Sequence, residues 1–345
     1  MIDPSLAKGT MNQRTMRVGI VGAGLVTTGS HLPALGGLPD VSVEWICDRS
    51  AAAAERAAAK YGVSDVQTDM DACRDVDVVL LATPVGTRRV LIPQALERGW
   101  HVFCEKPFAL TTADHDQFVA LVAARGLRLG VGQVRRFAGP TATARAIVAS
   151  GIFGDIQRLS AFEGTEVRNT GRGAEWYLTD TSQQTGVLLE TGSHLVDQLL
   201  YITDARDSEV TAVRRVERRS IELESQVEAT VRLPDGRAVP ALVGLSMLHD
   251  MCNGIFVEFD KALLHVGLFF GDKLRLITAE GRQICAIEQS AGINDDAMAF
   301  SLEWLDFLGH VRTGSTSVVD AASVRRTTQF IHDAYTMAAD IGVPV

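Results

Sequence analysis

The sequence predicts an α/β protein of two domains: a doubly wound parallel sheet, followed by an α+β unit with a large open, mostly antiparallel sheet. Up to about residue 132, short apolar runs alternate with helix-like stretches, which is typical of a parallel sheet covered on both faces. From residue 156 onward, strand-like segments with alternating apolar and polar residues follow one another. A length of 345 residues suits two domains.

The first half begins with a strand, a glycine turn and a helix. Residues 18–21 are apolar, Gly22 and Gly24 form the turn, and residues 25–38 carry helical apolar spacing. Such a turn aims backbone N–H groups and the positive end of the helix dipole at one point, which suits a pyrophosphate. This pattern is the dinucleotide fingerprint of a Rossmann fold, and a plain strand-to-helix connection is the alternative interpretation. The predicted cofactor contacts here are Gly22, Gly24, Leu25 and Val26.

The acid expected to bind the adenosine ribose follows the second strand. Asp48 comes directly after the apolar run 41–47, at the spacing typical of that acid. A carboxylate there favours NAD, although Arg49, also a predicted contact, either stacks on adenine or tolerates a 2′-phosphate, so NADP stays open. Thr27 replaces the third glycine of the fingerprint, which predicts a helix lying slightly further from the sheet.

Two further strand ends carry residues of interest, because ligands bind at the carboxyl ends of parallel strands. The expected elements are strands 76–82, 101–104 and 128–132, and helices 51–61, 89–98 and 112–124. Thr83 and Pro84 end the first of these strands. Glu105 and Lys106 end the second, before Pro107, where a cis bond can form. All four are predicted cofactor contacts, with a plain turn as the alternative for Thr83.

Lys106 is the first predicted catalytic residue. Its ammonium, placed where a nicotinamide should lie, is suited to hold a substrate hydroxyl and to stabilise an alkoxide as it forms. A surface lysine before a turn is the alternative.

The second half reads as an antiparallel sheet with closing helices. The predicted strands are residues 156–166, 210–218, 227–233, 238–245, 254–259, 263–269 and 274–277, with turns at 234–236 and 279–281 and helices at 140–150, 296–311 and 319–339. One face of this sheet is free to pair with a second subunit, so a homodimer or homotetramer is expected.

The stretch 185–202 holds the second predicted catalytic group. If it is one helix, Glu190, His194 and Asp197 stand four and three residues apart on one face. A carboxylate one turn before a histidine orients the imidazole as a general base. A structural histidine is the alternative. No metal site is expected, because no further cluster of ligands completes one.

The predicted substrate contacts lie around this stretch. Gln133 and Arg136 follow the last strand of the first domain, and Trp176 and Tyr177 belong to a polar loop, 168–184, that is expected to cover the substrate. Asp197 is the remaining predicted contact. An exposed loop with two incidental aromatic residues fits the 168–184 sequence equally well.

Composition and charge exclude several classes. A net charge of −9 argues against nucleic-acid binding, which needs a basic stripe, and no apolar run is long enough to span a membrane. Five scattered cysteines without close pairs fit a reducing cytoplasm. We expect a loose leader over residues 1–15, a cofactor domain over 16–135, and a substrate-binding and oligomerisation domain over 136–345.

These motifs together resemble those of the Gfo/Idh/MocA family, named after glucose-fructose oxidoreductase and inositol dehydrogenase. The order and separation of the motifs are specific, although each is loose alone. The carriers are the stretch GAGLVTTGSHLPAL from Gly22, the strand-end Asp48, Ala82 to Pro84, Glu105 to Pro107, and Gly192 to Asp197.

The resemblance implies a Rossmann domain, an open-sheet domain that makes dimers or tetramers, and hydride transfer at a carbinol of a sugar or cyclitol. It implies catalytic roles for Lys106 and His194. Glu190 falls where an aspartate is usual, Asp197 matches an acid that supports the site or touches substrate, and Arg88 stands where many relatives have a histidine.

The resulting hypothesis is an NAD(P)-dependent oxidoreductase acting on a secondary hydroxyl of a sugar, cyclitol or aminocyclitol, or on the matching ketone. His194 is the general base and Lys106 holds the reacting oxygen. Two alternatives use the same fold: a glycosidase in which NAD is reduced and reoxidised within one turnover, and a catalytically silent NAD-binding regulator. Intact Lys106 and His194 argue against the regulator.

Overall fold

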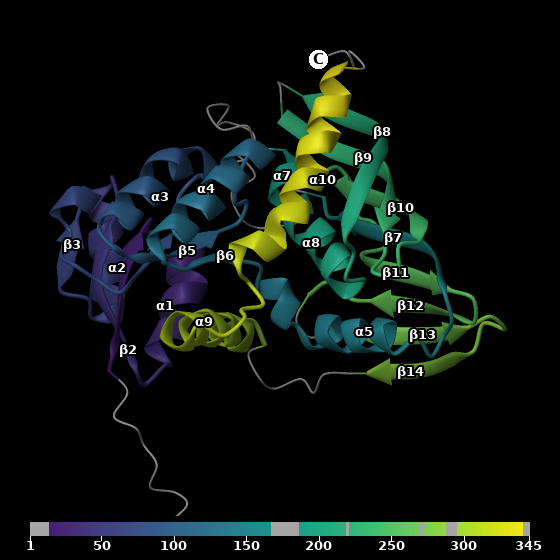
Figure 1. The fold of residues 1–345 in the computed structure, drawn as a ribbon, viewed down its shortest axis with the longest axis horizontal. Coiled ribbons are helices and arrows are strands. Elements are labelled where there is room, and N and C mark those ends of the chain that lie inside the picture. Colours follow the sequence, from purple (N-terminus) through teal and green to yellow (C-terminus); the bar gives the residue numbers. More distant parts are fainter. Residues whose placement is uncertain (1–13, 167–185, 219–220, 270–271, 288–294, 341–345) are drawn as a thin grey trace, which may run out of the picture.

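The protein consists of two lobes, each built on one sheet, with the last helix crossing between them (Figure 1). The computed structural model describes residues 14–166, 186–218, 221–269, 272–287 and 295–340. Of the leader, only Arg14 and Thr15 fall within these ranges, and Arg14 forms an ion pair with Asp77 at 3.0 Å.

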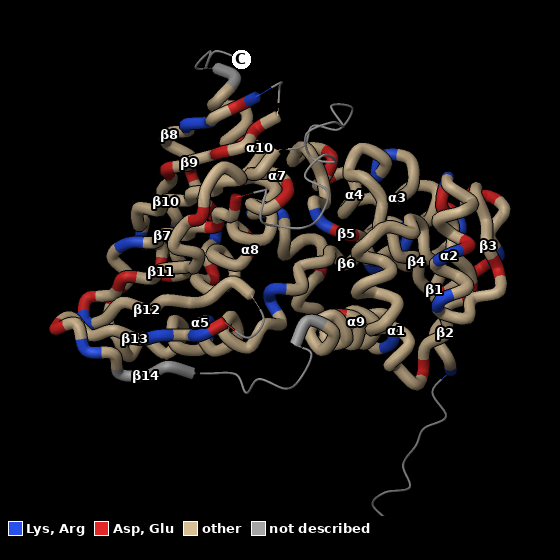
Figure 2. The backbone as a smooth tube through the Cα atoms, turned by 180° about the vertical axis from the view of Figure 1, so that it is seen from behind, with Lys and Arg blue, Asp and Glu red and all other residues tan. Residues whose placement is uncertain are grey.

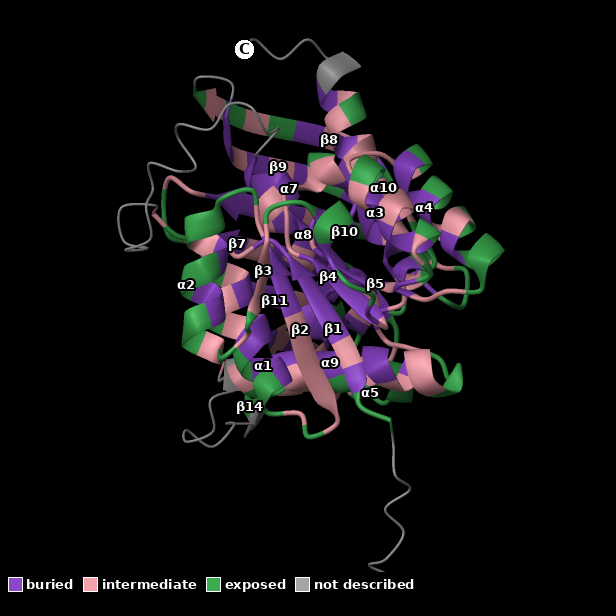
Figure 3. Cartoon of the chain, turned by 90° about the vertical axis from the view of Figure 1, so that its left-hand side faces the viewer, coloured by how far each residue is buried: buried purple, intermediate pink, exposed green. Residues whose placement is uncertain are grey.

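The first sheet is parallel and has six strands in the order β3-β2-β1-β4-β5-β6. Its strands are β1 Met16–Val21, β2 Val41–Cys47, β3 Asp65–Gln67, β4 Val78–Leu81, β5 His101–Glu105 and β6 Leu129–Gly132. The central strands are continuous apolar runs because helices cover both faces of the sheet (Figure 3). The predicted doubly wound sheet is confirmed. β3 was not predicted, since three residues with polar ends give no strand signal.

Two helices of this lobe, α2 Ala51–Tyr61 and α4 Thr112–Arg125, begin at a capping hydroxyl residue and end at a glycine. The helices of the lobe are α1 Leu32–Gly36, which continues a π-helical turn η2 Thr27–His31, α2, α3 Arg88–Glu97 and α4, with short 3₁₀ turns η3 Met70–Ala72, η4 Val85–Thr87 and η5 Val134–Phe137. The hydroxyl of Thr111 accepts a hydrogen bond from the Asp114 N–H at 3.1 Å, as expected of an N-cap.

The second sheet has eight strands in the order β14-β13-β12-β11-β7-β10-β9-β8. They are β7 Ile156–Gly164, β8 Asp207–Arg218, β9 Ile221–Arg232, β10 Ala238–Ser246, β11 Gly254–Phe259, β12 Ala262–Val266, β13 Leu274–Thr278 and β14 Gln283–Ile287. Every neighbouring pair is antiparallel except β7 with β10. The predicted open, mostly antiparallel sheet is confirmed, although β14 was missed.

One face of this sheet is buried under helices. On β9, Val227, Ala229 and Val231 are buried, as their alternation with polar residues predicts, and they share a core with Leu195 and Leu199. Those leucines belong to α8 Gly192–Ile202, which α5 Gly139–Ser150 and α10 Ala321–Asp340 accompany.

The stretch predicted as one helix over 185–202 is divided at Thr191. The structure has α7 Val187–Glu190 and then α8, with Thr191 between them. Glu190 and His194 therefore belong to different helices.

The chain returns to the first lobe after the second sheet. Helix α9 Asp295–Thr313 places Trp304 and Phe307, both fully buried, against Phe103 of β5. Helix α9 therefore completes the core of the first sheet, although it follows the second sheet in the sequence.

The described residues also show helix lengths, free thiols and a distribution of charged side chains that the sequence had raised as questions. None of the described helices is long and apolar enough to cross a membrane. Cys47, Cys73, Cys104 and Cys252 are free thiols. Acidic and basic residues are interspersed on both lobes in the view of Figure 2.

His115 links α4 to α10. Its Nε2–H donates to the carbonyl of Ala321, so Nδ1 must be the acceptor for the Thr328 hydroxyl; both distances are 2.9 Å. Burial lowers the pKa of His115 to about 4 from an ordinary 6.5. The buried, neutral imidazole therefore links α4 to the first turns of α10.

We predict that this contact makes stability fall on acidification. The unfolded chain binds a proton on His115 from about pH 6.5 downward, whereas the folded protein excludes it until about pH 4, so the free energy of unfolding decreases through that range. In His115→Gln, the slope of this free energy against pH should be smaller by up to about 1 kcal/mol per pH unit. Urea unfolding between pH 4 and 6.5 measures it. His332→Gln is the matched control, and equal slopes in wild type and His115→Gln would contradict the prediction.

Candidate active site

The glycine turn after β1 has the backbone that the fingerprint requires. Gly22 adopts φ +102°, and a Cβ there would lie 2.3 Å from the carbonyl oxygen of Ala82. Gly24 has no heavy atom within 4 Å of the position of a Cβ. The first glycine is therefore required by the fold, whereas the second leaves open space beside the backbone, as close approach of a pyrophosphate demands.

Asp48 is tied to the same turn. Its carboxylate accepts hydrogen bonds from the backbone N–H of Ala23 and of Ser50, both at 2.8 Å. The predicted ribose acid therefore also fixes the turn, with lone pairs left for a ligand hydroxyl.

Thr27 is accommodated by a change in the helix. The side chain is fully buried and its hydroxyl donates to the carbonyl of Gly22 at 2.6 Å, while the helix widens into the π-turn η2 at this residue. Leu25 and Arg49 are exposed beside the turn, and Val26 is half-buried.

A buried arginine, Arg88, forms hydrogen bonds at the carboxyl ends of both β4 and β5. Arg88 donates to the carbonyl oxygens of Thr83 and of Glu105, the latter at 2.7 Å. The Thr83 hydroxyl shares a hydrogen bond of 2.7 Å with that of Thr87, and Pro84 is half-buried. Arg88, noted in the sequence only as a departure from the family pattern, thus fixes the spacing between the ends of β4 and β5.

The Glu105 carboxylate accepts a hydrogen bond from the buried side chain of His31. Trp304 Nε1–H donates to His31 Nδ1 at 3.0 Å, so the other ring nitrogen of His31 carries the proton and donates to Glu105 Oε1 at 2.8 Å. The second carboxylate oxygen accepts from the Lys106 N–H at 3.0 Å. Burial raises the pKa of Glu105, but the bond from His31 and the charge of Lys106 outweigh it, and the net pKa is lowered. Glu105 therefore orients the Lys106 backbone.

Lys106 reaches across from the first lobe to the second. The Lys106–Pro107 bond is cis. Lys106 Nζ donates to the backbone carbonyl of Glu190 at 3.2 Å and lies 3.5 Å from its carboxylate. We expected that carboxylate to orient His194, yet no hydrogen bond joins the two side chains in the described structure. The division at Thr191 turns Glu190 toward the lysine instead.

His194 lies on the first turn of α8, four residues after Glu190. Its Nδ1 is buried without a hydrogen-bond partner. Burial, followed by the charges of Lys106 and of Arg135, lowers the pKa of His194 well below 6.5. A neutral imidazole with an unpartnered nitrogen is suited to accept a proton.

Arg135 is a charged neighbour that the sequence analysis did not select. It forms a bidentate ion pair with Glu163 of β7 at 2.7 and 2.8 Å, and its guanidinium lies 5.1 Å from the ring centre of Phe269. Gln133, two residues earlier, donates to the carbonyl of Ser193 at 3.5 Å, and its own Oε1 is buried and unpartnered.

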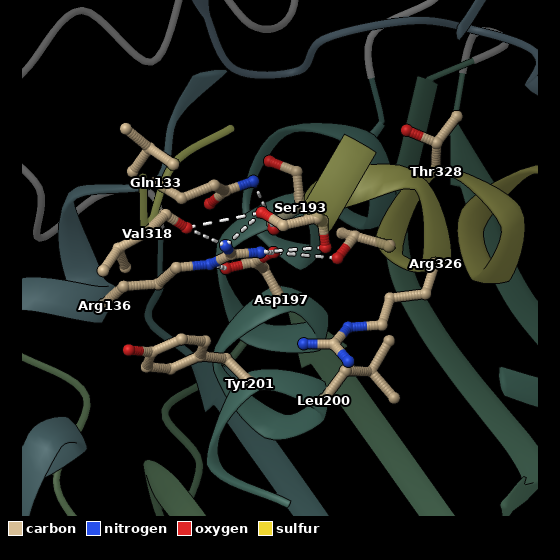
Figure 4. A network of polar contacts seen from close by, with 12 residues as sticks. Gln133, Arg136, Ser193, Asp197, Leu200, Tyr201, Val318, Arg326 and Thr328 are labelled. Atoms are coloured by element: carbon tan, nitrogen blue, oxygen red, sulfur yellow. Dashed lines mark hydrogen bonds and ion pairs between the residues drawn. The ribbon is translucent and has the colours of Figure 1, made fainter. Parts of the chain in front are cut away.

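Arg136 and Asp197, both predicted substrate contacts, are instead buried against each other (Figure 4). Their two hydrogen bonds measure 2.7 and 2.6 Å, and Thr327 of α10 donates to the same carboxylate at 2.9 Å. This pair joins η5 to α8, and a substrate contact by either residue stays a prediction. The other two predicted contacts, Trp176 and Tyr177, lie outside the described residues.

The same residues were compared with known proteins. Residues 16–133 match the model of an oxidoreductase family with an NAD-binding Rossmann fold, and residues 141–259 match the Gfo/Idh/MocA C-terminal domain. The chain belongs to the Gfo/Idh/MocA family. The predicted family and NAD-binding domain are thereby confirmed.

Relatives within the family differ in what they act on. The chain is 36% identical over 148 residues to inositol 2-dehydrogenase 4 of Saccharopolyspora erythraea, which covers 42% of this chain and 44% of that protein. It is 29% identical over 198 residues to D-glucoside 3-dehydrogenase of Escherichia coli, covering 56% of each. The chain thus spans about half the length of these curated relatives. A solved levoglucosan dehydrogenase, in complex with NADH and levoglucosan, shares the fold with a TM-score of 0.81 at 16% identity, covering 94% of this chain and 97% of that one.

The sequence did not predict the residues that contact the site residues from distant parts of the chain. His31 lies inside the GAGLVTTGSHLPAL stretch, but only its contacts with Glu105 and Trp304 give it a role in the site. Arg135 stands beside the selected Arg136, and the choice between them depends on which side of η5 each faces. Within the described residues, no group of three or more His, Cys, Asp or Glu side chains is placed to hold a metal ion.

We predict that substitution of the first turn glycine lowers the stability of the fold, whereas substitution of the second weakens cofactor binding. Gly22→Ala should lower the melting temperature by several degrees, because of the positive φ and the contact with Ala82. Gly24→Ala should leave the apo melting temperature unchanged but weaken NAD about tenfold or more, since its methyl group occupies the open space. Calorimetric titration with NAD measures the second effect. Unchanged NAD affinity in a folded Gly24→Ala variant would contradict the assignment of the turn.

Proposed function

We propose that this protein transfers hydride between NAD and a secondary alcohol of a sugar or cyclitol, or the corresponding ketone. The observation that carries the proposal is the contact of the Lys106 ammonium, from the end of β5, with the carbonyl of Glu190, four residues before His194. Burial, followed by the charge of that ammonium, lowers the pKa of the His194 imidazole. Homology to inositol and glucoside dehydrogenases supports a polyhydroxylated substrate.

The residues present fit the cofactor. The turn at Gly22 and Gly24 leaves space beside the backbone, and Asp48 is fixed next to it with lone pairs available. Gly22, Gly24, Leu25 and Val26 would hold the pyrophosphate, Asp48 and Arg49 the adenosine end, and Thr83, Pro84, Glu105 and Lys106 the nicotinamide end. NAD, when bound, supplies the hydride acceptor.

Each residue then has one task in alcohol oxidation. Lys106 donates a hydrogen bond to the substrate oxygen and stabilises the negative charge that develops on it. His194 accepts the hydroxyl proton while the carbon loses its hydride, and it returns the proton in the reverse direction. Glu190 positions the ammonium. The net change is an alcohol to a ketone, one hydride and one proton.

The polar loop and the quaternary structure complete the proposal. Gln133, Trp176 and Tyr177 are proposed substrate contacts, and the uncovered face of the second sheet is the proposed surface for a homodimer or homotetramer. The free cysteines among the described residues support a cytoplasmic location as part of this proposal.

A substrate screen tests the function directly. Incubating the protein with NAD and a panel of cyclitols, sugars and glycosides should give net accumulation of NADH with at least one polyol. Cleavage of a glycoside without net NADH would favour the glycosidase alternative. Binding of NAD with neither reaction would favour the regulator.

We predict that Lys106→Met and His194→Asn each reduce kcat about 10²–10⁴-fold, the usual contribution of general acid–base catalysis. Their NAD dissociation constants should change less than about threefold, because the adenosine and pyrophosphate contacts lie elsewhere. Lys261→Met, which removes an exposed lysine, is the control. A His194→Asn variant with wild-type turnover would remove that residue from the mechanism.

We predict an unusual pH profile for alcohol oxidation. Because burial and two positive charges lower the pKa of His194 well below 6.5, the base stays neutral, and kcat/KM should not decline as the pH falls to 6.5. In Lys106→Met, one of those charges is gone, so the acidic limb of the residual activity should move to higher pH. A wild-type limb centred at or above 6.5 would be inconsistent with this environment.

A further inference from the structure

A cavity lies at the other end of α8 from His194. It has a volume of about 560 Å³ and lies among α5, the C-terminal end of α8, the start of β8 and the first turns of α10. Because a helix rises 1.5 Å per residue, Tyr201 lies roughly 10 Å along the axis from His194. The cavity is therefore separate from the Lys106–His194 site.

Arginine side chains dominate the charge of this cavity. Five arginines line it, and three of them are already neutralised by carboxylates. The neutralised pairs are Arg136 with Asp197, Arg145 with Asp204, and Arg325 with Asp116. The lining residue Asp207 is likewise engaged, with Arg232 at 3.3 Å. Two positive charges remain, those of Arg206 and Arg326.

These two guanidinium groups have donors to spare. The side chain of Arg206 is exposed and makes no hydrogen bond or ion pair within the described structure; only its backbone N–H is used, by the Arg232 carbonyl. Arg326 donates to the carbonyl of Ala205, while its Nε is buried without a partner.

The surroundings of Arg326 are unfavourable to its charge. Its guanidinium extends from α10 toward the Arg136–Asp197 pair (Figure 4). Burial, followed by the charge of Arg136, lowers the pKa of Arg326. A negative charge in the cavity would relieve this repulsion.

Hydroxyl groups supply further donors. The Oγ of Ser208 is buried without a partner, and Thr316 lies exposed on the opposite segment of the lining. Two unmatched guanidinium groups and two hydroxyls fit the charge and the several acceptor oxygens of a phosphate dianion.

We propose that this cavity binds a phosphate dianion between Arg206 and Arg326, either free phosphate or the phosphate group of a small metabolite. The volume leaves room for an organic substituent beside the anion.

The test is binding of inorganic phosphate and of glycerol 3-phosphate, with glycerol and sodium chloride at matched ionic strength as controls. Saturating NAD is present throughout, so that the pyrophosphate site of the cofactor is filled. Both anions should raise the melting temperature by about 2 °C or more once in large excess over Kd. Tighter binding of glycerol 3-phosphate than of phosphate identifies a phosphorylated metabolite, and equal affinities identify free phosphate.

Variants locate the site. Arg206→Gln and Arg326→Gln should each weaken calorimetric affinity about fivefold or more, whereas Arg158→Gln, an exposed arginine paired with Glu258 on the second sheet, should not. Arg206 has no side-chain partner to lose, so its variant tests the proposal even if Arg326→Gln does not fold. No anion response in wild type, or equal affinity in wild type and Arg206→Gln, would overturn the proposal.

Discussion

The buried ion pair of Arg136 and Asp197 fixes the relation between the two lobes. Arg136 belongs to η5, directly after the last strand of the first sheet, and Asp197 belongs to the helix that carries His194. The pair also binds the start of α10, since Arg136 donates to the carbonyl of Val318 at 2.5 Å and to the Ser323 hydroxyl at 2.8 Å. Burial lowers the pKa of Arg136, but the carboxylate outweighs it and the net pKa is raised. Breaking such a pair leaves an uncompensated buried charge, at a cost of about 3–5 kcal/mol.

The geometry of the proposed catalytic site depends on the Arg136–Asp197 ion pair. Lys106 comes from the first lobe and His194 from the second, so their separation is set by contacts between the lobes. The Glu105 carboxylate orients Lys106 from one side, through His31 and Trp304. The same tryptophan belongs to α9, which follows the second sheet in sequence but completes the core of the first. A single chain that crosses between lobes three times, at η5, before α9 and before α10, therefore holds the site from both sides.

Local patterns predicted most of the architecture and the positions of the motifs. The glycine turn, Asp48 and the two strand ends are consequences of hydrophobic periodicity and turn chemistry, which short windows of sequence express. The partners could not be predicted in this way. Arg88 donates a hydrogen bond to the carbonyl of Glu105, 17 residues away in the sequence, and Trp304 donates one to His31, 273 residues away. The residues next to Arg88 and Trp304 in the sequence do not predict these hydrogen-bond partners. The division between α7 and α8 was missed for a related reason: helical periodicity continues through Thr191, and only the contact with Lys106 shows which way Glu190 turns.

On the proposed assignment, the electrostatics of the site favour one direction of reaction. Oxidation needs a neutral imidazole as the base, and the lowered pKa of His194 keeps that form populated at neutral pH. Reduction needs the imidazolium, whose fraction falls tenfold for each unit by which the pKa lies below the ambient pH. The ammonium of Lys106 therefore acts twice. It stabilises the alkoxide directly, and it raises the free energy of the protonated histidine next to it. The first effect favours removal of the hydroxyl proton, whereas the second keeps His194 unprotonated at neutral pH but makes its imidazole a weaker base. The ammonium therefore favours oxidation through the protonation state of the imidazole and not through its basicity.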